Sequence, residues 1–231
     1  MSSGILIPSI EKRITDFIEL TRKAAKELKE KERKHTTITI SREFGCDGYP
    51  VAEKLKALLE GRTRETWEIM DKALLEETTK KHNLLEGVLS KLGEKSRVLE
   101  DVVSTFSPVW KTEHDYYKLL CEQLFALAVV GNVIIVGRGG AIVTQGLDNC
   151  LHFRLFGSSR CKMQYMSKRI DLPDAELKAL IEKKQKERNK FVRDFLNCDA
   201  GELHYYHLVF NCDKTPSEKI AHTIADYAFS K

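Results

Sequence analysis

The sequence predicts an α/β fold in which helices cover both faces of a parallel sheet. Segments with strand character alternate along the chain with segments of helical periodicity. The first strand runs into a glycine-containing turn and then a helix, which is half of a βαβ unit. Ligands of such sheets bind beyond the carboxyl ends of the strands. This rule directs attention to Asp71 and to residues 41–48, 137–140 and 157–160.

Length and composition indicate one main domain and a chain that stays in the cytoplasm. With 231 residues, 42% of them hydrophobic, the chain can bury one sizeable core. The longest apolar run is interrupted by Gly131 and Asn132 and is shorter than the roughly 20 residues of a membrane span. No secretion signal opens the sequence. The six cysteines form no CxxC pair, so we expect reduced thiols and no zinc site.

Basic residues outnumber acidic ones in residues 160–193, although the net charge is only +4. An anionic ligand and a solvated helix face both fit this pattern. Nucleic-acid binding is a weaker hypothesis, because the charge is mixed and no aromatic stacking platform is interleaved with it.

Residues 1–35 are predicted to form an N-terminal amphipathic helical extension. From Ser9 to about Lys34 apolar residues recur at spacings of three and four, and Ser9 suits the N-cap. The other face is charged. We expect the extension to pack on the domain or on a second copy of the chain, as a homodimer, and a regulatory role is the alternative.

The first strand is predicted at Thr36–Ile40, where the period changes to two and β-branched residues prevail. A helix is expected over 50–60, with Pro50 at its first position, where a missing N–H costs nothing. Four further segments have strand character: 67–70, 132–136, 151–156 and 207–210.

The turn after the first strand has the shape of a phosphate loop, because unpaired N–H groups and a helix dipole would both point at an anion. Against the pattern G-x-x-x-x-G-K-[ST], however, the chain keeps only Gly48. Tyr49 replaces the lysine that neutralises the outer phosphates, Pro50 replaces the hydroxyl that ligates magnesium, and Asp47 adds a negative charge. A loop that only connects strand and helix is the alternative. The candidate phosphate-loop residues are Gly45, Cys46, Asp47, Gly48, Tyr49 and Pro50.

Residues 40–45 with Gly48 resemble the first strand and loop of the cytidylate-kinase-like family, a branch of the P-loop nucleoside monophosphate kinases. Residues 70–75, 131–140 and 206–211 are similar to later motifs of that family, in the same order. The resemblance implies a three-layer P-loop kinase-like domain over 36–231 with a five-stranded parallel sheet ordered 2-3-1-4-5. It also implies a helical acceptor-binding insertion at 80–122 and lid-like helices at 157–195.

The resemblance further implies transfer of the γ-phosphoryl group of ATP to a nucleotide such as CMP, with Mg²⁺ held mainly by phosphates and water and no metal ligand from the protein. Such transfer depends on positioning and on positive charge around the phosphoryl group. Arg138 would bind the acceptor phosphate, and Arg160 and Arg188 would be the arginines that the lid brings to the transferring phosphate.

Further residues at the strand ends keep alternative roles. Arg42 could reach nucleotide phosphates or pair with Glu43 or Asp71. Asp71 could cap a helix or bind the acceptor, beside Gly137 and Arg138. His204 and His207 are better explained as a structural pair than as a metal site.

A second hypothesis is a nucleotide-binding or regulatory protein that keeps the kinase fold and is catalytically impaired. The altered residues Asp47, Tyr49 and Pro50 in the loop support it. So do Gly139 and Gln185, which stand where the family commonly has aspartates. The sequence leaves both hypotheses open.

Overall fold

The computed structural model of the chain describes residues 35–75 and 111–230. The predicted N-terminal helix, apart from its last position, and residues 80–110 of the predicted insertion lie outside the described residues. Their roles in dimer formation and acceptor binding stay predictions. In the described ranges, no helix combines the length and apolar character that a membrane crossing requires.

The sheet has five parallel strands in the order β2-β3-β1-β4-β5, as predicted. The central strand β1 (Thr37–Arg42) pairs with β3 (Val133–Val136) on one side and β4 (Cys150–Phe156) on the other. The outer strands are β2 (Glu68–Met70), beside β3, and β5 (Leu208–Asn211), beside β4. Each strand begins within one residue of its predicted start.

Two predicted boundaries need correction. The first strand continues past Ile40, because Ser41 and Arg42 still pair with β4. The helix α2 (Gly48–Thr63) begins two residues before Pro50, and the N–H of Val51 makes a backbone bond of 3.2 Å to the carbonyl of Asp47. Pro50 therefore occupies the third position rather than the first. Proline is tolerated there because N–H groups of the first turn have no intrahelical acceptor.

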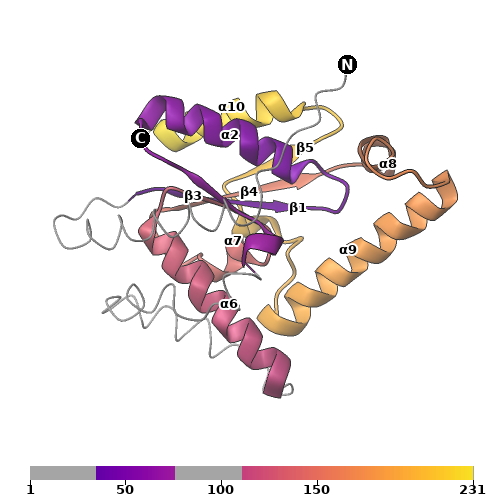
Figure 1. Cartoon of the computed structure of the whole chain (residues 1–231), viewed down its shortest axis with the longest axis horizontal. Helices are drawn as coiled ribbons and strands as arrows, with labels where there is room; N and C mark the ends of the chain where they lie inside the picture. Colours follow the sequence, from indigo (N-terminus) through magenta and orange to yellow (C-terminus); the bar gives the residue numbers. More distant parts are fainter. Residues whose placement is uncertain (1–34, 76–110, 231) are drawn as a thin grey trace.

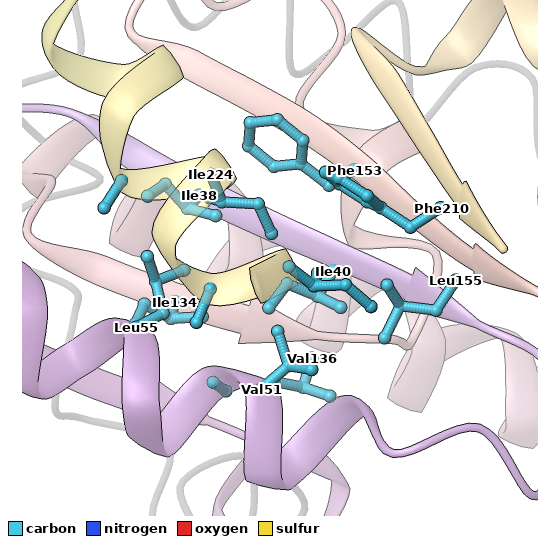
Figure 2. Packing of buried hydrophobic residues seen from close by; sticks show 14 of the residues in the cluster. Ile38, Ile40, Val51, Leu55, Ile134, Val136, Phe153, Leu155, Phe210 and Ile224 are labelled. Carbon is cyan, nitrogen blue, oxygen red and sulfur yellow. The ribbon is translucent and has the colours of Figure 1, made fainter. Parts of the chain in front are cut away.

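One face of the sheet packs against α2 and α10 (Ser217–Phe229). Ile38 and Ile40 of β1 point into this layer because side chains alternate between the two faces of a strand. Figure 2 shows them among Val51 and Leu55 of α2 and Ile224 of α10.

The opposite face is covered by α6 (Lys111–Val130), by the short α7 (Gly140–Val143) and by the C-terminal part of α9 (Asp174–Leu196). Figure 1 shows the resulting three layers, with α2 and α10 on one side of the sheet and α6 on the other. Two core clusters thus hold the sheet in place, and only the strand ends remain for ligands.

The helices α8 (Ser159–Met166) and α9 follow β4 in the region predicted to be lid-like, and their role as a lid stays a prediction. Ser158 caps α8 by accepting a hydrogen bond from the N–H of Cys161 at 3.2 Å. A separate small cluster joins the two helices through Met166, Leu177 and Ile181, and Phe44 of the loop packs against it. A 3₁₀ turn, η1 (Leu203–Tyr205), leads into β5.

Candidate functional site

A cavity of about 450 Å³ opens at the carboxyl ends of β1 and β3, and α9 forms one of its walls. Its volume lies within the range of small-molecule sites, roughly 300–1,000 Å³. Among the lining residues that the structure describes, six are cationic and one is a carboxylate, Glu187. The cationic residues are Arg42, Lys72, Arg138, Arg154, Lys184 and Arg188. The cavity is therefore electropositive.

The turn after β3 presents Arg138 to this cavity. Gly137, Arg138 and Gly139 all have positive φ, at 81°, 56° and 71°, and the N–H of Gly140 closes the turn on the carbonyl of Gly137 at 3.0 Å. A left-handed conformation costs a residue other than glycine about 1 kcal/mol or more. The Arg138 guanidinium lies 4.8 Å from the ring centre of Phe191 on α9. Such strain is commonly retained where a side chain must point at a ligand.

The side chain of Arg42 lies between two glycines. A Cβ atom at Gly137 would stand 1.6 Å from Nη1 of Arg42, and one at Gly48 would stand 3.0 Å from its Cγ. Both positions therefore have to lack a side chain for Arg42 to cross from β1 toward the β3 turn. Arg188 of α9 joins this group, because its Nη1 donates to the carbonyl of Arg42 at 3.3 Å.

Burial and mutual repulsion make these guanidinium groups costly to keep together. Burial lowers the pKa of Arg42, and the charges of Arg188 and Arg138 lower it further, while Asp71 opposes them. Burial and the charge of Arg138 likewise lower the pKa of Arg188. Guanidinium groups still remain protonated at neutral pH. A bound anion would offset this repulsion, which is the electrostatic pattern of a prepared anion site.

A polar network that the sequence analysis missed forms the floor of the cavity. Tyr206 donates its hydroxyl proton to the carbonyl of Ala200 at 2.7 Å, and its oxygen lies 3.1 Å from Ser41 Oγ, within hydrogen-bond distance. Arg154 donates to the same carbonyl and to Ser41 Oγ. The available signal was an arginine in the mostly apolar strand β4.

The backbone of the candidate phosphate loop is largely bonded to the chain's own oxygens. The N–H of Phe44 donates to Gln185 Oε1 at 2.7 Å, and that of Cys46 donates to the carbonyl of Glu43 at 3.2 Å. The N–H of Gly48 reaches the carbonyl of Cys46 at 2.8 Å across Asp47, whose φ of −73° and ψ of 57° are those of an inverse γ-turn. The N–H groups of Phe44, Cys46 and Gly48 are thus bonded within the protein.

The carboxylates of the loop take up nearby cations. Glu43 Oε2 lies 2.7 Å from Lys162 Nζ on α8, and Asp47 Oδ1 lies 2.8 Å from Arg169 Nη2. A Cβ atom at Gly45 would stand only 2.7 Å from the Cβ of Lys162, so α8 rests directly on the loop. Binding of the ATP triphosphate at this loop stays a prediction.

Comparison with known proteins assigns the family. A sequence model described as the cytidylate kinase-like family matches residues 37–214. The chain belongs to the cytidylate kinase-like family. Membership supports a kinase-like, nucleotide-binding protein, in agreement with the electropositive cavity. None of the curated protein sequences matches the chain.

Solved structures support the fold. A crystal structure of an uncharacterized protein from Eubacterium ventriosum ATCC 27560 has a TM-score of 0.66 and 21% identity, covering 86% of this chain and 100% of that chain. A crystal structure of TT1252 from Thermus thermophilus has 15% identity and a TM-score of 0.36, covering 85% and 98% of the two chains, and this score is too low to indicate a common fold. The first similarity concerns the fold and says nothing about the substrate.

The structure gathers some of the predicted site residues of this family member and separates others. Arg42, Gly137, Arg138 and Arg188 line the same cavity. Arg160 is exposed on the first turn of α8 and is not among the described residues that line the cavity.

Other candidates have structural partners. Asp71 accepts a hydrogen bond from the N–H of Leu74 at 3.0 Å, as a helix cap does. His207 accepts one through Nδ1 from the N–H of His152 at 3.0 Å, while His204 lies beside Glu202. In the loop, a hydrogen bond with Cys212 and burial raise the pKa of the Cys46 thiol, so it stays protonated.

Proposed function

We propose that this protein binds a nucleoside monophosphate, such as CMP, with the phosphate held in the cavity by Arg42, Arg138 and Arg188. The observation that carries the proposal is the convergence of these three guanidinium groups at the glycine turn after β3. Guanidinium groups bind phosphate oxygens through paired, charge-assisted hydrogen bonds. The glycines on both sides of Arg138 allow close approach of the ligand.

The rest of the cavity suits the nucleoside. Apolar side chains from α7 and α9, namely Ile142, Phe191 and Val192, line it beside polar groups such as Asn189. A mostly apolar wall with a few polar contacts is typical of sites that bind small organic ligands. The class of base is open, and CMP is the acceptor that the family description suggests.

The geometry favours a binding protein with impaired catalysis over an efficient kinase. Lysine and hydroxyl are missing from the loop, and Phe44, Cys46 and Gly48 have their N–H groups occupied. A phosphoryl donor would therefore lack the standard loop lysine and these three backbone donors.

Transfer of the γ-phosphoryl group of ATP is the second candidate function. The contact of Arg188 with the end of β1 favours it, because this places a lid arginine next to the arginines of the cavity. In that case Mg²⁺ would be held mainly by phosphates and water.

The test combines calorimetric titration with a transfer assay. We expect CMP or another ribo- or deoxyribonucleoside monophosphate to bind the wild-type chain. Its affinity for Arg138→Ala should be about 10- to 100-fold weaker, because the substitution removes charge-assisted hydrogen bonds to the phosphate. Arg62→Ala removes an exposed arginine of α2 that pairs with Asp226 and serves as the matched control. Failure of every monophosphate to bind, or equal binding by Arg138→Ala, would overturn the proposal.

The assay with labelled γ-phosphate of magnesium-ATP decides between the two candidates. No transfer to a monophosphate that binds supports the impaired protein. Turnover on one acceptor, lost in Arg138→Ala, establishes the kinase.

A further inference from the structure

The candidate phosphate loop is neutralised from within the chain. Glu43 Oε2 contacts Lys162 Nζ at 2.7 Å and accepts a hydrogen bond from the N–H of Gly157 at 3.3 Å, while Arg154 lies 3.9 Å from its other oxygen. One carboxylate thus has two cations and a backbone donor around it. This is the set of partners that an oxyanion of a phosphate seeks.

Asp47 is a second carboxylate of the loop, paired with a single cation. Its Oδ1 lies 2.8 Å from Arg169, just beyond α8. Burial raises the pKa of this carboxyl group, while the charge of Arg169 opposes the shift. The side chain does not cap α2, although Asp47 occupies the N-cap position. Its charge is therefore directed at the lid rather than at the helix.

Burial distinguishes the Lys162–Glu43 pair from an ordinary surface salt bridge. The side chains are only 15% and 24% exposed, whereas exposed pairs commonly contribute little. The contact also brings α8 against Gly45, where it leaves no room for a further group. Gln185 is the third residue that takes up a group near the loop, because its neutral side-chain oxygen accepts the hydrogen bond from the N–H of Phe44.

We propose that Glu43 and Asp47 are internal anions that occupy the phosphate-donor position of this fold, so that a nucleoside triphosphate binds there only when these carboxylates are removed. The lid cations Lys162 and Arg169 are then held by the protein and not by a nucleotide. This inference concerns the loop and goes beyond the monophosphate site in the arginine cavity.

The experiment measures binding of magnesium-ATP and of inorganic tripolyphosphate to the double variant Glu43→Gln, Asp47→Asn. These amides keep the size of the side chains and lose the charges. We expect affinity for both ligands to rise about tenfold or more, because two cations become available. Affinity for the nucleoside monophosphate stays as in wild type.

Two control variants make the outcome specific. Glu218→Gln with Asp226→Asn removes two carboxylates that pair with Lys54 and Arg62, so the net charge changes equally, and we expect no gain. Adding Lys162→Ala to the loop variant should abolish its gain. If the loop variant fails to fold, as judged by circular dichroism, Asp47→Asn alone is measured, with a smaller gain expected.

An unchanged or weaker affinity for both ligands in the loop variant would overturn the inference. Tight binding of magnesium-ATP by the wild-type chain that Lys162→Ala weakens would overturn it as well, because the nucleotide would then bind at the loop with both carboxylates present. Different results would contradict the monophosphate proposal: no monophosphate binds the wild-type chain, or Arg138→Ala binds it as tightly as wild type does. The two sets of results are therefore distinguishable.

Discussion

Gln185 of α9 accepts a hydrogen bond of 2.7 Å from the backbone N–H of Phe44, a residue 141 positions away in the sequence. The same helix donates to β1 through Arg188, whose guanidinium also lies 4.9 Å from the ring centre of Phe44. Helix α9 is thus attached to Phe44 by one hydrogen bond and one cation–π contact.

Removing the side-chain acceptor should loosen the loop. In Gln185→Ala we expect amide exchange at Phe44 to quicken by about tenfold, because its N–H loses a partner worth roughly 1–1.5 kcal/mol. Gln185→Glu keeps an acceptor oxygen and should keep the protection. Hydrogen exchange measured by NMR on both variants decides the point, and equal rates in wild type and Gln185→Ala would contradict it.

Gly137 can be tested by adding the missing methyl group. Gly137→Ala should displace the Arg42 guanidinium and strain a position with φ of 81°, which lowers the free energy of unfolding by about 1–3 kcal/mol. Binding of the monophosphate should weaken by about tenfold or more. Urea denaturation and calorimetry measure the two effects.

Gly61→Ala is the matched control for that substitution. Gly61 lies in α2 with open space around its Cβ position, so alanine should raise stability by about 0.5–1 kcal/mol. A Gly137→Ala variant that binds the monophosphate as wild type does would show that Arg42 is dispensable.

Stability should fall in weak acid because of His152. This side chain is 3% exposed and its Nδ1 lies 2.8 Å from Thr39 Oγ1, and burial, with the nearby His207, lowers its pKa to about 4. The unfolded chain binds a proton near pH 6.5 that the folded chain binds only near pH 4, so the free energy of unfolding falls as the pH falls through this window. The loss is on the order of 2 kcal/mol at about pH 5.

Urea denaturation between about pH 8 and pH 5 measures this dependence. His152→Gln should show a smaller loss of stability over the same range, whatever its stability at pH 8. An identical pH dependence in both proteins would mean that His152 is not the titrating group.

The floor of the cavity depends on one hydroxyl group. Tyr206→Phe removes the hydroxyl that donates to the carbonyl of Ala200 and contacts Ser41 Oγ, which should lower the free energy of unfolding by about 1–2 kcal/mol. The ring that lies beside Arg154 remains. Thermal denaturation measures the change, and an unaltered melting temperature would assign the network no stabilising role.

The fold was predictable because the strands are short apolar runs between turn residues. Segments such as 133–136 are buried on both faces of the sheet, so their composition alone identifies them. The rule that ligands bind at the carboxyl ends of strands also placed Arg42 and Arg138 in one region. Their meeting in one cavity follows from the neighbouring positions of β1 and β3.

The partners of the Phe44 N–H group and of the loop's carboxylates were not predictable, because they come from segments that are distant in the sequence. Nothing near Phe44 in the sequence indicates that Gln185 will occupy its N–H, and nothing near Glu43 points to Lys162. Arg160 lies exposed on α8, and its predicted role at the transferring phosphate stays a prediction. The cap at Ser158 fixes the rotation of α8, which brings Lys162 to the loop and leaves Arg160 exposed.

The small cluster that joins α8 and α9 gives the lid a packing unit of its own. Leu177 and Ile181 contact Met166 rather than the sheet, whereas Val192 and Leu196 at the other end of α9 belong to the main core. If the two helices swing outward about that anchored end, their mutual packing travels with them. Such a movement would still separate Phe44 from the small cluster and withdraw Cys161 and Tyr165 of α8 from the core that α2 and α10 share, so its cost would combine this lost apolar contact with the polar contacts to the loop.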